Sequence, residues 1–176
     1  MHKNKRFNVY DLSGEYGIGF TRKDDEFYFD LDDYDKIKYH CWYVENGGGR
    51  VCARNVAGGT PLKLHRFILD LEDPKIEVDH INHNQLDNRK SNLRVCNHSQ
   101  NLKNHNILCT NTSGYVGVWM RKESGRYTAR IEVDGKKINL GTYDDIESAL
   151  IARLKAEKKY YGEFSSQQEL FDKYNI

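Results

Sequence analysis

Long apolar runs are missing from this sequence of 176 residues, and no stretch approaches the roughly 18 consecutive apolar residues of a transmembrane helix. We therefore expect no membrane partner. The first residues, MHKNKRFNVYDLSG, contain no apolar segment of the kind found in signal peptides, so we do not expect secretion. The four cysteines form no CxxC pair, which argues against a zinc ribbon and favours reduced thiols in a cytoplasmic protein. A disordered chain is excluded, because 12 Tyr, 7 Phe and 2 Trp are too many aromatic residues for one.

A strong excess of either charge is also missing, because 27 Lys and Arg residues stand against 26 Asp and Glu, a formal net charge of +1. Near-neutrality taken alone argues against a nucleic-acid partner. The charges are unevenly distributed, however: residues 24–35 contain seven acidic residues and no Lys or Arg, whereas residues 113–143 contain six basic and three acidic residues. We therefore expect the last third of the chain to face DNA and the acidic segment to face away from the phosphates.

Glycine and asparagine mark most boundaries, since the chain has only two prolines. Residues 7–64 contain short β-prone runs, two of which flank the NGGG sequence at 46–49 and predict a hairpin. Residues 75–106 predict a strand in KIEVDHIN, an Asn-rich loop, a second strand in LRVC and a helix in NHSQNLKNHN.

The last third of the sequence has the clearest pattern. Three β-prone runs, YVGVWMRK, RYTARIEV and KKINLGTY, are separated by turn signals at Ser124-Gly125 and Asp134-Gly135. Residues 144–162 predict an amphipathic helix, with Asp144 and Glu147 as its N-terminal capping pair. These patterns together predict an α+β protein that ends in a three-stranded antiparallel sheet packed on one helix.

A group of polar residues in the middle of the chain suits phosphodiester hydrolysis. Asp79 and His80 end a predicted strand, and Asn92 and Asn101 follow in the loop and in the predicted helix. The reaction needs a base that activates water, and a histidine near its ordinary pKa of about 6.5 does this at neutral pH. It also needs a cation, and a hard divalent cation prefers oxygen ligands such as Asp79 and the amide of Asn101. Because strand neighbours point to opposite faces, Asp79 and His80 can take different roles only if the strand ends or bends there.

The motif V-D-H-I-N … D-N-R-x-S-N-L-R-V … S-Q-N, preceded by L-H-R at residues 64–66, resembles the HNH (ββα-metal) endonucleases of phages and group I introns. This resemblance implies that His80 is the general base and that Asp79 is a metal ligand. Asn92 would hold the loop and the base in place. We expect His65, within L-H-R, to be packed or to contact a phosphate rather than to bind metal.

Two further residues complete the metal site that the resemblance implies. Asn101 stands where many members of the family carry their last histidine, and this departure favours Mg²⁺ or Mn²⁺ over Zn²⁺. His105 lies four residues later, one helical turn on, and is either a further metal ligand or a DNA contact.

The C-terminal pattern resembles a second family, the ethylene-response-factor (APETALA-type) DNA-binding domain. The matching residues are S-G-Y-x-G-V at 113–118, G-R-Y-x-A-x-I at 125–131, L-G-T-Y at 140–143 and E-x-A at 147–149. The resemblance implies that double-stranded DNA binds the sheet, because a β-sheet can enter the major groove. The residues expected to face DNA are Trp119, Arg121, Arg126, Arg130, Lys137 and Asn139. Since the family differs at the positions of Trp119 and Arg130, its target sequence is not carried over.

We therefore predict a metal-dependent HNH DNA endonuclease of the homing or mobile-element type, present as a monomer or homodimer in the cytoplasm of a bacterial host or phage-infected cell. The alternative is a non-catalytic, sequence-specific DNA-binding regulator on an HNH scaffold. A monomer with one site would nick one strand. The expected parts are a β-rich N-terminal region (1–59), the ββα-metal nuclease module (60–108), a linker (109–112), the DNA-binding domain (113–164) and a tail (165–176).

Overall fold

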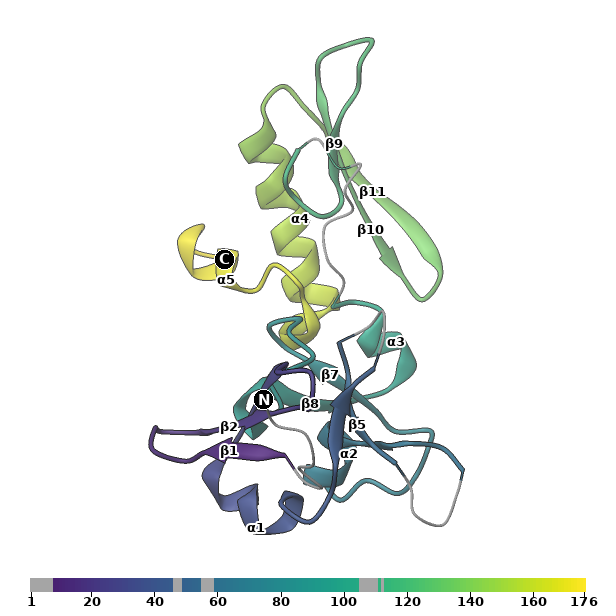
Figure 1. Cartoon of the computed structure of the whole chain (residues 1–176). Coiled ribbons are helices and arrows are strands. Elements are labelled where there is room, and N and C mark those ends of the chain that lie inside the picture. Colours follow the sequence, from purple (N-terminus) through teal and green to yellow (C-terminus); the bar gives the residue numbers. More distant parts are fainter. Residues whose placement is uncertain (1–7, 46–48, 55–58, 105–110, 112) are drawn as a thin grey trace. The chain divides into compact units, whose positions relative to one another are not determined.

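The chain folds as a mixed α+β protein, as the sequence predicts. The computed structural model describes residues 8–45, 49–54, 59–104, 111 and 113–176, and in these residues four small antiparallel sheets are joined by short helices (Figure 1). By its internal contacts the chain divides into two compact units, residues 1–97 and 98–176, so the division falls inside the nuclease module expected at 60–108. Within the described residues, no helix is long and apolar enough to cross a membrane.

The first unit contains three of the sheets. They are β1 (Val9–Asp11), β2 (Gly17–Phe20) and β3 (Glu26–Phe29); β4 (Trp42–Val44), β5 (Val51–Ala53) and β6 (Leu62–Lys63); and the pair β7 (Glu77–His80) and β8 (Leu93–Cys96). The helices of this unit are η1 (Leu31–Asp33), α1 (Tyr34–Ile37), α2 (Leu64–Ile68) and η2 (Lys90–Asn92). The hairpin predicted around 46–49 has its strands in β4 and β5, while residues 46–48 lie outside the described part.

The core of the first unit depends on two glycines that face aromatic residues across a strand pair. Gly17 pairs with Phe29 and Gly19 pairs with Phe27, and both phenylalanines are fully buried. The missing side chains leave room for the rings, since a Cβ atom at Gly19 would lie 2.2 Å from Cζ of Phe27. Trp42 completes this core and donates from Nε1 to the carbonyl oxygen of Ile37 (3.0 Å).

The second unit has the element order that the sequence predicts for its last third. After α3 (His98–Asn101) come β9 (Val118–Met120), β10 (Tyr127–Val133), β11 (Lys136–Tyr143) and α4 (Ile146–Tyr160), with β10 in the middle of the sheet. Helix α4 packs Ala149 against Val118 and Ala129. Its N-cap is Asp145, which accepts from the Ser148 backbone N–H (2.7 Å), so the predicted cap at Asp144 is wrong by one residue.

Residues 165–176, described from the sequence as a tail, are packed into the second unit. They follow η3 (Gly162–Phe164) and contain α5 (Glu169–Lys173), whose Phe171 packs against Leu150 and Leu154. The fully buried Glu157 accepts hydrogen bonds from Arg153 Nε (2.6 Å), Gln167 Nε2 (2.9 Å) and the Ser165 hydroxyl. Because Gln167 Oε1 also accepts from the Val116 N–H (2.8 Å), this network links α4 to the segment that enters β9.

We predict that Gly19→Ala destabilises the protein by about 1–3 kcal/mol, because the added methyl group overlaps the buried ring of Phe27. The matched control is Gly14→Ala, where the nearest atom to the new Cβ would be the Tyr16 carbonyl oxygen at 3.6 Å. The free energy of unfolding from urea titration measures both. Equal stability of the two variants would contradict the packing described for this sheet.

Candidate active site and nucleic-acid interface

The hairpin of β7 and β8 carries the predicted acid and base. Asp79 pairs in register with Arg94 and His80 pairs with Leu93, and β7 ends at His80. Both Asp79 and His80 are buried, with 7% of their surface exposed. The strand thus ends at the residue where the sequence requires it to end or bend.

Asn92 ties together the loop that joins β7 to β8. Its Oδ1 accepts from the backbone N–H of Asn82 (2.9 Å), and its Nδ2 donates to the backbone oxygen of Asp87 (2.8 Å). Its own carbonyl oxygen accepts from the N–H of Ile81, directly after the candidate base (2.9 Å). An amide side chain suits this role, since it offers a donor and an acceptor on two separate atoms. These contacts are those of a residue that positions the loop.

The N-terminal region, to which the sequence analysis assigned no role, also holds this loop. The N–H of Tyr28 donates to Leu86 O and the N–H of Asn88 donates to Tyr28 O, both at 2.8 Å. Two carboxylates of the acidic segment bind Lys90: Asp30 accepts from its backbone N–H (2.7 Å) and Asp33 pairs with its Nζ (2.8 Å). Part of the acidic segment is therefore used inside the first unit, next to Asn92.

A second buried histidine contacts the candidate base. The rings of His65 and His80 meet edge to face, with 5.3 Å between centroids and an interplanar angle of 88°. Burial, followed by the charge of His80, lowers the pKa of His65 to about 3. Burial also lowers the pKa of His80, against the opposing effects of the Asn88 side chain and the Asp79 charge. Both imidazoles are therefore neutral at pH 7, and the packed state expected of His65 is the one found.

Arg66, the third residue of the L-H-R sequence, fixes the chain that leads into β7. Its Nη2 donates to the carbonyl oxygens of Leu71 (3.2 Å) and Asp73 (2.7 Å), and its Nη1 donates to that of Ile76. This guanidinium therefore holds the turn immediately before Glu77, the first residue of β7.

Asp79 fits a divalent cation by its chemistry, and it is also engaged with Arg94. Nε and Nη2 of Arg94 both donate to the same oxygen, Oδ2, at 2.8 and 2.6 Å. Among the residues that the structure describes, no group of three or more His, Cys, Asp or Glu side chains is arranged to hold a metal ion. A site here would rest on one carboxylate and amide oxygens, which is the sparse ligand set that Mg²⁺ accepts when water and phosphate complete its shell.

Within the first unit, the structure brings together Asp79, His80 and Asn92. Asn101 ends α3 and belongs to the second unit, and His105 lies outside the described residues. The residues that sequence reasoning missed are His65 as the neighbour of His80, Arg94 as the partner of Asp79, and Asp30 and Asp33 as partners of Lys90. The acidic segment is visible in the sequence, but Lys90, with which it pairs, lies about 60 residues away.

Most of the predicted DNA-facing residues share the sheet face opposite α4. Val118, Ala129 and Ile131 pack toward the helix, so the residues that alternate with them form the outer face. Opposite pairs on this face are Trp119 with Thr128, Arg130 with Asn139, and Glu132 with Lys137. The Arg130 guanidinium stacks on the Trp119 ring, 4.7 Å from its centroid, and Arg121 Nε donates to Thr128 Oγ1 (2.9 Å).

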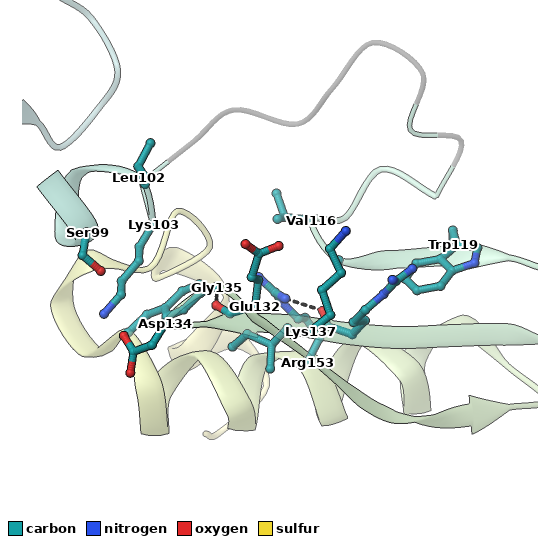
Figure 2. Close-up of a pocket in the computed structure, with 14 residues that line it drawn as sticks. Ser99, Leu102, Lys103, Val116, Trp119, Glu132, Asp134, Gly135, Lys137 and Arg153 are labelled. Carbon is teal, nitrogen blue, oxygen red and sulfur yellow. Dashed lines mark hydrogen bonds between the residues drawn. The ribbon is translucent and has the colours of Figure 1, made fainter.

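Arg126 differs from the rest of the predicted set, because it lies before the first residue of β10 and its Nε pairs with Asp144 (2.7 Å). A pocket of about 660 Å³ adjoins the outer face, and Figure 2 shows Trp119 at one end of it and Ser99 and Lys103 at the other. Arg153 lines it from α4 and donates to the backbone oxygen of Arg130 (Figure 2). The outer face thus carries an aromatic ring, cations and amide groups together.

Comparison with known proteins identifies one family. Residues 63–103 match a family described as HNH endonuclease, and this match supports a nuclease. The matched segment contains His65, Asp79, His80, Asn92 and Asn101. Searches of curated proteins and of solved structures gave no match to the chain.

We predict that Asp33→Ala loosens the loop held by Asn92, because it removes the buried partner of Lys90. The expected loss of stability is about 1 kcal/mol, since Lys90 remains half exposed and regains water. Hydrogen exchange of the amides of residues 81–92 reports the loosening. The control is Asp35→Ala, which removes an exposed ion pair with Lys38 from the same segment. We call the contacts of Asp30 and Asp33 with Lys90 the clamp. Equal hydrogen exchange in the two variants would contradict its role in holding the loop.

Proposed function

We propose that this protein is a metal-dependent HNH DNA endonuclease that hydrolyses phosphodiester bonds at the end of β7. The observation that carries the proposal is a buried carboxylate beside a buried, neutral imidazole, Asp79 and His80, inside the segment that matches HNH endonucleases. The hydrophobic effect does not bury these two groups, because burying a carboxylate or an imidazole costs free energy unless hydrogen bonds or ion pairs compensate. Such a cost is expected at a site that acts on a substrate.

His80 is the general base of the proposed reaction. Its imidazole is neutral at pH 7, because burial lowers its pKa below the ordinary value, and it can therefore accept the proton of the attacking water. The ring of His65 meets it edge to face and restricts its orientation. Asn92 fixes the backbone on the C-terminal side of the base through its contact with Ile81. These residues hold the base in position, and positioning of the reacting groups lowers the barrier of a hydrolysis.

Asp79 would hold the divalent cation, Mg²⁺ or Mn²⁺, with Asn101 and His105 as the further proposed ligands. When bound, such a cation supplies positive charge to the phosphate and the leaving oxygen. Arg94, which donates two hydrogen bonds to Asp79 Oδ2, fixes the orientation of this carboxylate.

The C-terminal sheet is proposed to target the enzyme to double-stranded DNA, in the manner of the ethylene-response-factor domains that its sequence resembles. The outer face supports this: the stacked pair of Trp119 and Arg130 is flanked by Arg121, Lys137 and Asn139. Arginine reads guanine and asparagine reads adenine in the major groove. An endonuclease with a separate targeting domain is suited to a homing or mobile-element role, in which one site nicks and two copies break both strands.

A non-catalytic DNA-binding regulator is the second candidate. The observation that favours it is the ion pair of Asp79 with Arg94, which already satisfies Oδ2 of the proposed metal ligand. In that case the HNH segment would serve as a scaffold for the outer face of the sheet.

We predict that the purified chain converts supercoiled plasmid to relaxed or linear DNA with Mg²⁺ or Mn²⁺, and that His80→Ala reduces the rate by at least about 100-fold, as expected for loss of a general base. His98→Ala is the control, because His98 is an exposed histidine in the matched segment. Circular dichroism confirms that both variants fold. If neither wild type nor variants cut while all of them shift DNA on a gel, the regulator is correct.

We predict that Arg130→Ala and Trp119→Ala weaken DNA binding by about 1–3 kcal/mol and change the footprint, because each removes half of the stacked pair on the outer face. Fluorescence anisotropy with the intact chain measures the affinity. The control is Lys155→Ala, which removes a charge from the exposed side of α4. Unchanged affinity and footprint in both sheet variants would exclude this face as the DNA contact.

A further inference from the structure

Most cations around the candidate site are already bound to groups of the protein. Arg94 is paired with Asp79, Arg89 with Asp87, and Lys90 with Asp33, at 2.6, 2.6 and 2.8 Å. The guanidinium of Arg66 donates hydrogen bonds to three backbone carbonyl oxygens. These side chains hold the first unit together, so a negatively charged substrate would have to meet other cations.

Arg50 and Lys63 differ from these cations in their contacts. Within the described ranges 8–45, 49–54 and 59–97, neither forms an ion pair or a side-chain hydrogen bond. Arg50 is exposed and Lys63 is partly exposed, so water and solutes reach both. Their charges are therefore available to a ligand without breaking an existing contact.

The sheet of β4, β5 and β6 places these two cations on one face. Cys52 and Lys63 are directly opposite each other, and Arg50 lies two residues before Cys52 on the same chain, so their side chains share a face. The other face of this sheet carries Val51 and Ala53 and packs into the core. The two cations thus lie on the face of Cys52, which is itself buried, at positions where Arg50 is exposed and Lys63 is partly exposed.

This face adjoins the two buried histidines. Lys63 directly precedes α2, in which His65 meets the ring of His80. After burial, which has the largest effect, the positive charge of Arg50 lowers the pKa of both His65 and His80, and Lys63 acts on His65 in the same way. A charge acts on a buried imidazole most strongly at short range. The effects of Arg50 and Lys63 on these pKa values therefore agree with the strand register, which places both cations near the histidines.

We propose that Arg50 and Lys63 bind the non-bridging oxygens of a DNA phosphate beside His80. This proposal rests on the proposed function and names the residues that hold its substrate. Arg50 offers a planar fork that matches two phosphate oxygens, whereas Lys63 supplies a compact charge. The pair lies outside the loop that carries Asn92, so the base and the phosphate contacts come from different strands and helices of the same unit.

The test measures DNA binding and cleavage by the intact chain at several salt concentrations. A protein that neutralises one phosphate fewer has a slope of log affinity against log salt that is smaller by about 0.9. We expect Arg50→Ala and Lys63→Ala each to reduce the slope by part of this amount, because the other cation still contacts the phosphate, and to lower kcat/KM by about tenfold to hundredfold. Arg50→Lys should keep the slope, because the charge remains, and lose part of the rate, because the fork is gone.

The control variant is Lys23→Ala, which removes one exposed positive charge from the turn between β2 and β3 and should leave rate and slope unchanged. Thermal melting confirms that each variant folds. The proposal is overturned if Arg50→Ala matches wild type in rate and slope, or if Lys23→Ala changes the slope as much. If wild type binds DNA without cutting it, the slope still decides whether Arg50 contacts phosphate, while the proposed nuclease function alone fails.

Discussion

The side chain of Asn92 is the contact on which the geometry of the candidate site depends. Its amide joins the beginning of the β7–β8 loop, at Asn82, to the middle of that loop, at Asp87. These two hydrogen bonds act together with the contact between the Asn92 carbonyl oxygen and the Ile81 N–H, which fixes the backbone directly after His80. A loop rich in asparagine can satisfy its own backbone in this way, because each amide offers a donor and an acceptor.

Many charged side chains of the first unit are paired with one another and serve its structure. Carboxylates of the acidic segment, together with Asp79 and Asp87, are matched against Lys90, Arg94 and Arg89. Buried histidines remain neutral because the surrounding low-dielectric interior disfavours their charged form. Near-zero net charge in the sequence therefore hides an arrangement in which acidic residues pair with the cations around the candidate site.

Local patterns in the sequence predicted local structure well, and contacts between distant segments poorly. The end of β7 at His80 and the three strands before α4 follow from alternation and turn signals, which act over a few residues. The cap at Asp145 instead of Asp144 shows the ordinary one-residue uncertainty of such signals. The contact of His65 with His80 and the pairing of Asp33 with Lys90 join segments that no local pattern relates. The sequence also did not predict that aromatic rings lie over Gly17 and Gly19, because these partners are selected by the register of two paired strands.

The clamp between the acidic segment and Lys90 has a consequence for the order of folding. Its two contacts close chain separations of 60 and 57 residues, and the entropy of closing such loops must be met before the contacts stabilise anything. The β7–β8 hairpin can pair early, because its strands are near neighbours in sequence. The loop between them is held in its final shape by contacts with Tyr28 of β3 and Asp30, directly before η1. We therefore expect the candidate site to be among the last parts of the first unit to form, since the segment that matches the HNH family is held by residues that precede it.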